Sequence, residues 1–282
     1  MKPASIELCC AGRPVARYVT RPELDPRHSP RPYLHPVTTL GGIRVTELMP
    51  EDHPHHLGAG VAVPDVAGHN FWGGRTFVRD HGPTALDNHG EQRHDGFRRS
   101  GPGGFVEELS WSAGDRVLLR ETRTVTTAEV GESAWALDLA FSLTDVSGHG
   151  LSLGSPATNG RPGAAYGGFF WRAPREATAP DVFGADAAGE RAVHGRRSEW
   201  VALAGEGWTL VFAGATEETR RDPWFVRAAE YPGVGSSLAH ADRLVVAVRT
   251  AEGHVERILS KLGFTSRSQV AVWTASRSTT RP

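Results

Sequence analysis

The sequence is poor in cysteine and has no long apolar run. Its only two cysteines are the neighbours Cys9 and Cys10, and a disulfide between adjacent residues is strained because their Cβ vectors point apart in an extended chain. We therefore expect two reduced thiols in a strand, as in a cytoplasmic protein. The sequence predicts no membrane span, which needs ~20 apolar residues, and no secretory signal peptide.

Charge of one sign is not in excess either. The 31 lysines and arginines nearly balance the 32 aspartates and glutamates, for a formal net charge of -1 at pH 7. The chain as a whole has no electrostatic attraction for nucleic acid or for an anionic membrane, so we expect neither as a partner. The sequence also contains no HExxH, CxxC or GxxxxGK motif, which removes the zinc-peptidase, zinc-ribbon and P-loop interpretations.

Glycine and proline, by contrast, are plentiful. The 33 glycines and 19 prolines of this 282-residue chain separate short segments in which apolar and polar residues alternate, and this pattern is typical of strands joined by turns. Many antiparallel strands with short connections favour an all-β sandwich, which we expect to form one domain over residues 1–282. We expect its strands and hairpins over residues 5–20, 105–130, 133–146, 199–214 and 243–248.

Few segments favour a helix or a long loop. Apolar residues recur at helical spacing over residues 253–263, which predicts a short helix that covers a sheet edge. Residues 65–104 show little alternation and are rich in glycine, histidine and charged residues, so we expect a long functional loop there. The polar segment 266–282 is expected to fray.

Histidine is concentrated in one part of the chain. Eight of the 13 histidines lie between residues 35 and 94, and imidazole is the side chain that binds metals and transfers protons near neutral pH. The densest group is His53, His55 and His56, in the run EDHPHH. If this segment is extended, as Pro54 favours, His53 and His55 point to one face and His56 points to the other.

Three interpretations of these histidines are open. His53 and His55 could bind a divalent metal ion with Glu121, as a two-histidine, one-carboxylate set, or with a third ligand from among His35, His89 and His94. Without a metal, one histidine acts as general acid or base while its neighbours fix its tautomer. In the third interpretation the segment is a polar loop whose histidines bind backbone and water.

Further candidates stand beside glycines and turns. Asn70 and Trp72 precede two glycines, an arrangement that can form the floor and hydrogen-bonding rim of a sugar site, although a turn with a core tryptophan fits equally well. Arg172 ends a glycine-rich segment and can point into a site or pair with a carboxylate. The candidate catalytic residues are thus His35, His53, His55, His56 and Arg172, and the candidate substrate-binding residues are Asn70, Trp72, His89, His94 and Trp224.

The sequence resembles the DUF6807 family, whose members are often labelled methane oxygenase PmoA, in six runs. They are RPYLHPV (31–37), DHPHHLG (52–58), DVAGHNFW (65–72), GGFFWR (167–172), GRRSEWV (195–201) and PWFVR (223–227). The resemblance therefore spans most of the chain. It implies a β-rich protein with a galactose-mutarotase-like supersandwich, from a family that often sits among bacterial genes of sugar catabolism.

Three functions follow from the histidines and the resemblance. The first is an enzyme that acts on a carbohydrate or glycoside as an epimerase, lyase or hydrolase, by acid–base chemistry or with one divalent metal ion. In that enzyme Trp72 stacks on the sugar and Arg172 holds a carboxylate or a developing oxyanion. The second is a non-catalytic carbohydrate-binding sandwich, which would show aromatics without acid–base groups. The third is a metal-dependent oxygenase, as the family label suggests.

Overall fold

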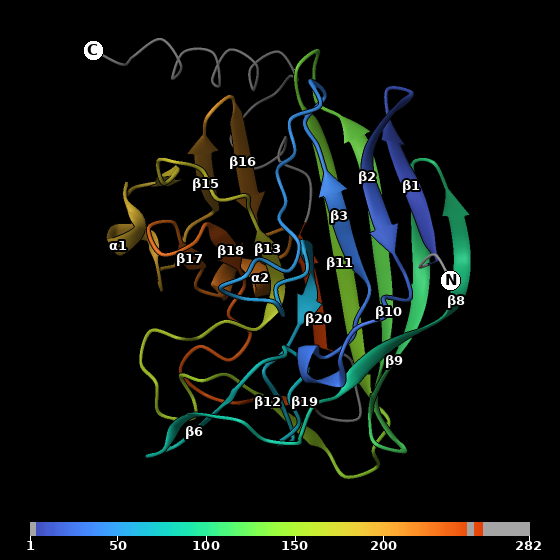
Figure 1. Ribbon diagram of the computed structural model, residues 1–282, viewed down its shortest axis with the longest axis vertical. Coiled ribbons are helices and arrows are strands. Elements are labelled where there is room, and N and C mark those ends of the chain that lie inside the picture. Colours follow the sequence, from blue (N-terminus) through green and yellow to red (C-terminus); the bar gives the residue numbers. More distant parts are fainter. Residues whose placement is uncertain (1–3, 247–250, 256–282) are drawn as a thin grey trace.

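The computed structural model describes residues 4–246 and 251–255, whose strands form two large sheets and three small ones, all with antiparallel neighbours (Figure 1). The larger sheet has the order β1 (Ser5–Cys10), β2 (Arg13–Val19), β3 (Tyr33–Val37), β4 (Ala59–Ala62), β13 (Gly168–Arg172), β18 (Gly233–Gly235) and β17 (Phe225–Arg227). The second has the order β20 (Ala251–Val255), β11 (Trp135–Asp145), β10 (Arg116–Glu129), β9 (Gly104–Ala113) and β8 (Glu91–Gly101).

The remaining elements are short. The small sheets have the orders β19 (Leu244–Val246), β12 (Leu151–Gly154) and β5 (Asp65–Val66); β14 (Asp181–Gly184), β15 (Trp200–Gly205) and β16 (Trp208–Ala213); and β6 (Thr76–Val78) with β7 (Gly82–Thr84). The described helices are the 3-10 turn Pro26–His28, α1 (Glu190–Val193) and α2 (Glu217–Arg221). No helix among the described residues is long and apolar enough to span a membrane.

The two large sheets pack face to face (Figure 1). One hydrophobic core joins Leu8 and Leu34 of the first sheet to Leu119 and Leu143 of the second, and burying such side chains is the main favourable term in folding. The prediction of an all-β sandwich with few short helices is confirmed. The finer expectation of a galactose-mutarotase-like supersandwich stays a prediction, as does the single domain over residues 1–282.

Most of the expected strands are present. The predicted hairpins over residues 5–20, 105–130 and 199–214 are β1–β2, β9–β10 and β15–β16, and the strand over 133–146 is β11. Cys9 and Cys10 are free thiols in β1, as expected. Of the strand expected over 243–248, the structure describes Leu244–Val246 as β19, and residues 247 and 248 lie outside the described part.

Two expectations about local structure are wrong. Residues 65–104 are not one long loop, because they include the 11-residue strand β8. The inward positions of β8 are the polar Gln92 and His94 and the apolar Phe97, so the strand has little alternation of apolar and polar residues. The predicted helix over 253–263 is contradicted at its start, where β20 pairs with β11. The rest of that helix and the tail 266–282 lie outside the described residues.

Strand β13 positions the candidate site. All five of its residues are buried, and successive side chains of a strand point to opposite faces. Phe169 and Trp171 join the sandwich core. Phe170 belongs instead to a second apolar cluster, with Ala62, Trp72, Phe225 and Tyr231. Arg172 shares the face of Phe170, so its guanidinium lies outside the sandwich core, under the loops that cover this sheet.

Candidate functional site

The histidine segment is a compact turn. The main-chain N–H of His53 donates to the carbonyl of Pro50 and that of His56 to the carbonyl of His53, each at 2.9 Å, so the expectation of an extended segment is wrong. The reason is the bridge between Leu48 and Leu57, which forces the chain to reverse between them. The turn brings all three rings together. His53 stacks on His56 at 4.5 Å between centroids, and His55 meets His56 edge-on at 4.9 Å.

Burial keeps two of these imidazoles neutral. His56 is 2% exposed and lies among Trp72, Phe170 and Tyr231. Loss of hydration, reinforced by the charges around it, lowers the pKa of His56 well below 6.5. The same effects lower the pKa of His55 to about 3. In the described part of the chain Nδ1 of His56 has no hydrogen-bond partner. At neutral pH both rings are therefore uncharged and each has a ring nitrogen that can accept a hydrogen bond.

His53 lies at the mouth of the cluster. Its side chain is 27% exposed, and its Nδ1 is 3.2 Å from Oδ2 of Asp52, a charge contact that lacks hydrogen-bond geometry among the described residues. Burial opposes ionisation of Asp52, but the contacts with His53 and Arg172 outweigh it and lower the pKa of this carboxyl. Asp52 is thus a carboxylate at neutral pH and can orient the His53 ring.

Arg172 completes the cluster. Its main chain joins two loops, since its N–H donates to Gly58 and its carbonyl accepts from Glu47. The guanidinium is fully buried and lies over the ring of Tyr231, at 4.7 Å from the centroid. Nη2 is 3.4 Å from carboxylate oxygens of Glu47 and Asp52, which is long for a hydrogen bond. Nε and Nη1 have no partner among the described residues.

Asn70 and His89 support the cluster from behind. The side-chain oxygen of Asn70 accepts the main-chain N–H groups of Trp72 and Gly73, and Nε2 of His89 lies 2.7 Å from the carbonyl of Gly74. These bonds hold a glycine turn against the His55 ring, where a Cβ on Gly74 would come within 2.8 Å of Nδ1. Both residues were predicted to bind substrate, and the structure places them as supports of the turn.

The predicted aromatic platforms are covered. Trp72 is 4% and Trp224 5% exposed, which leaves neither ring a free face on which a sugar could stack. Nε1 of Trp224 donates to the carbonyl of Ser198. Trp72 and Asn70 do border a small pocket beside Tyr166, whose lining does not include the three clustered histidines or Arg172.

His35 makes different contacts from those of the three clustered histidines. Its Nδ1 is 3.0 Å from Oγ1 of Thr46, and burial, helped by the charge of Arg44, lowers its pKa to about 4. No contact with His53, His55 or His56 is present in the described structure. His35 is therefore a neutral histidine of β3 that bonds to a neighbouring threonine.

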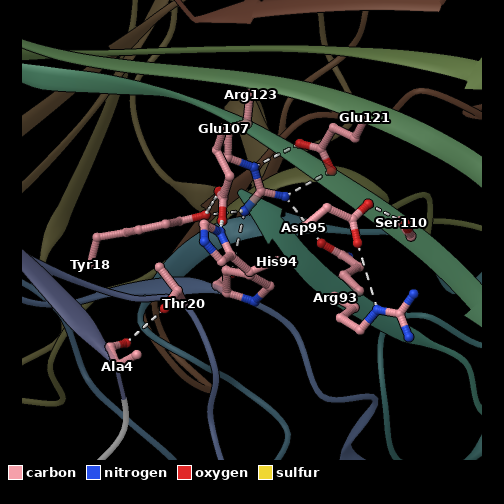
Figure 2. Close-up of polar contacts among 12 residues, drawn as sticks. Ala4, Tyr18, Thr20, Arg93, His94, Asp95, Glu107, Ser110, Glu121 and Arg123 are labelled. Carbon is pink, nitrogen blue, oxygen red and sulfur yellow. Dashed lines mark hydrogen bonds and ion pairs between the residues drawn. The ribbon is translucent and has the colours of Figure 1, made fainter. Parts of the chain in front are cut away.

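His94 and Glu121 belong to a separate network inside the sandwich (Figure 2). Tyr18 reaches from the first sheet to Glu107 and Arg123 of the second. His94 Nδ1 lies 2.5 Å from Glu107, and Glu121 binds Arg123 through two hydrogen bonds of 2.7 and 2.9 Å. The carboxylate of Glu121 is thus already paired.

The structure does not assemble the predicted metal ligands. Among the described residues, no group of three histidine, cysteine, aspartate or glutamate side chains is arranged to hold a metal ion. His53 and His55 lie close, with ring centroids 5.7 Å apart, but Glu121 lies in the core network with Arg123. A two-histidine, one-carboxylate set of these three residues is therefore not formed.

Sequence reasoning missed several residues of the site. Asp52 could have been predicted from the sequence, because it directly precedes His53. Tyr231 and Glu47 carried none, since they come from distant segments that only folding brings to Arg172. The expectation that the sequence contains no Gly-x-Ser-x-Gly motif is wrong, because residues 150–154 form this pattern. Its Ser152 lies within strand β12 and its Oγ accepts from Arg243, so it lacks the strand–turn–helix setting of a nucleophile elbow.

Fold and site together define a class: an antiparallel β-sandwich with a buried histidine–arginine cluster on the outer face of one sheet. The chain belongs to the DUF6807 family, a family of unknown function, whose model matches residues 5–254. This confirms the family resemblance of the sequence. No curated protein and no solved structure matches the chain.

Proposed function

We propose that this protein is an enzyme that transfers protons to and from a small carbohydrate, with His53 as the general base. The observation that carries the proposal is the Asp52–His53 pair, which is partly open to solvent beside two imidazoles that burial keeps neutral. In other enzymes a carboxylate beside a catalytic histidine favours the tautomer with the proton on Nδ1 and stabilises the imidazolium.

The proton transfer follows from this geometry. When His53 carries its proton on Nδ1, beside the Asp52 carboxylate, the Nε2 lone pair is left to take a proton from the substrate. In an epimerisation the planar intermediate turns in the site and the imidazolium returns this proton to its opposite face, whereas in an elimination the imidazolium passes the proton to a leaving hydroxyl, which departs as water. Neither step needs a further reactant.

The surroundings favour a hydroxyl-rich substrate. Glu47 and Asp52 have side chains that are 25% and 33% exposed, and with His53 they offer acceptors and a donor at the mouth of the cluster. Sites for small polar ligands depend on a few such converging groups. The buried tryptophans offer no stacking platform, which weighs against a purely carbohydrate-binding module, and the unassembled ligand set weighs against the oxygenase.

Exchange of substrate protons with solvent tests the proposal. The protein is incubated in D2O with a panel of aldoses, ketoses and sugar acids, and loss of C–H signals is followed by proton NMR. We expect exchange in at least one sugar, unchanged after EDTA treatment, and slowed ~100-fold or more in His53→Gln. The control is His81→Gln, an exposed histidine that should leave the rate unchanged. No exchange in the panel, or equal rates in His53→Gln and the wild type, contradicts the proposal.

A further inference from the structure

Two fully buried arginines in this fold differ in how they are paired. All five N–H donors of Arg123 have acceptors, at 2.7–3.4 Å, on Glu121, Gln92, Tyr18 and Pro32. Arg172 has only the two contacts of 3.4 Å through Nη2, and its Nε and Nη1 are unpaired within the described residues. Buried polar groups normally have partners, so the second arrangement is that of a site that is complete only with a ligand.

The charge around Arg172 indicates the sign of that ligand. Arg31 is also buried, and its hydrogen bonds go to the carbonyls of His28, Ser29 and His55, with no carboxylate among them. Arg172 faces Glu47 and Asp52, but these carboxylates are partly exposed and therefore hydrated. Both ion pairs of Arg172 are long and use Nη2 alone, and a fully buried guanidinium that is paired so weakly favours a further anionic acceptor.

The shape of the donor group indicates the kind of anion. The guanidinium lies over the ring of Tyr231, with Cζ 4.7 Å from the centroid, and this contact restricts the side chain while its N–H groups point outward in the guanidinium plane. Arginine held in this way recognises planar, two-oxygen acceptors such as carboxylate. His56 Nδ1, also unpaired and deeply buried, adds a second polar atom without a partner in the same cluster.

We infer that Arg172 binds the carboxylate of the substrate, so that the proposed enzyme acts on sugar acids rather than on neutral sugars. This inference rests on the proposed site. A carboxylate on the substrate would accept from Nε and Nη2 of Arg172, as Glu121 accepts from Arg123, would replace the 3.4 Å contacts of Nη2, and would place the adjacent carbons beside His53. It would also acidify a C–H bond next to the carboxylate, because the guanidinium stabilises the negative charge that develops there.

Binding measured without turnover tests the inference. Three matched pairs serve as probes: D-glucuronate with D-glucose, D-galacturonate with D-galactose, and D-gluconate with D-glucitol. Calorimetric titration of the wild-type protein should show at least one acid binding ~10-fold or more tightly than its neutral partner. Binding of that acid should weaken as salt is raised. If every acid binds no better than its neutral partner, the inference is wrong.

Substitutions around Arg172 should change the binding of the acid in opposite directions. Arg172→Met should remove the preference for the acid, whereas Arg191→Met, at an exposed arginine, should keep it. Glu47→Gln should instead tighten binding of the acid, because it removes a carboxylate that competes for Nη2. Equal binding of the acid by Arg172→Met and wild type overturns the inference, even if Glu47→Gln has the expected effect.

Failure of this inference is distinguishable from failure of the proposed function. If a sugar acid binds through Arg172 but undergoes no proton exchange, the carboxylate site is supported and the proposed enzymatic function is wrong. If proton exchange occurs only in neutral sugars, the proposed enzymatic function is supported and the carboxylate site is wrong.

Discussion

At the scale of single residues, Arg123 and Arg172 have the same burial and opposite roles. Arg123 neutralises Glu121 at close range within the core and saturates its donors. The carboxylates that face Arg172 are farther away and partly in water. Removing one partner of a buried ion pair leaves a desolvated charge behind, whereas removing an unsatisfied guanidinium does not.

The two arginines should therefore respond differently to the same substitution. We expect Arg123→Met to lower the free energy of unfolding by ~3–5 kcal/mol, because Glu121 is left buried and unpaired. Arg172→Met should change it by no more than ~1 kcal/mol. Urea unfolding of the two variants beside the wild type measures both values. Equal losses would show that Arg172 is a structural residue like Arg123.

At the scale of an element, the turn at Gly73 and Gly74 shapes the site without contributing a side chain. Gly74 has φ of +70° and lies directly against the His55 ring. Only glycine adopts this conformation readily and also leaves room for a neighbour so close. The turn is fixed by Asn70 and His89, which explains why those polar residues stand in the sequence beside glycines.

A methyl group at Gly74 should disturb His55. Gly74→Ala combines backbone strain of ~1–2 kcal/mol with a clash at 2.8 Å from Nδ1, and it should slow the proposed proton exchange. Gly82→Ala is the matched control, because Gly82 has φ of +78° with nothing within 4 Å of a Cβ. Urea unfolding of both variants compares their stability, and NMR of the imidazole nitrogens shows whether the His55 ring has moved. Together these measurements separate the clash with His55 from the backbone strain that both variants share. The prediction is wrong if Gly74→Ala is as stable as Gly82→Ala and the signals of His55 are unchanged.

The strands show which elements the sequence can predict. β10 was expected from its alternation, and its inward face is indeed Leu119, Glu121, Arg123 and Val125. β8 was missed because two of the residues that it turns inward, Gln92 and His94, are polar and have their partners on other strands. Alternation is a local signal, and it fails where a strand contributes hydrogen bonds instead of apolar area to the core.

At the scale of the whole molecule, buried neutral histidines should couple folding to pH. His35, His55 and His56 have pKa values below 6.5 in the folded state, at about 4, at about 3 and well below 6.5. The unfolded chain therefore binds more protons as the pH falls below 6.5, and stability is lost from there towards pH 4. Each histidine contributes up to ~1.4 kcal/mol per pH unit.

Asp222 opposes this trend. Burial raises its pKa from 3.8 to about 6, so its contribution to stability is lost as the pH rises through that range. The three histidines together contribute more to the pH dependence of the free energy of unfolding than Asp222 does. We therefore expect a net loss of stability on acidification from about pH 7 to about pH 4.5. Urea midpoints across this range measure it, and His55→Gln should reduce the slope. A flat profile would contradict neutral burial of these rings.

The sequence by itself determined the sandwich class, most strand positions and the family, because alternation, turn residues and short motifs depend on residues close together in the chain. It also located the histidine cluster. Only the tertiary structure decided what surrounds it. Asp52 and Arg172 are 120 residues apart in sequence, and Tyr231 follows Arg172 from yet another segment. Which arginine is saturated, which tryptophan is covered and which histidine reaches water depend on the packing of such distant segments, and no local pattern records that packing.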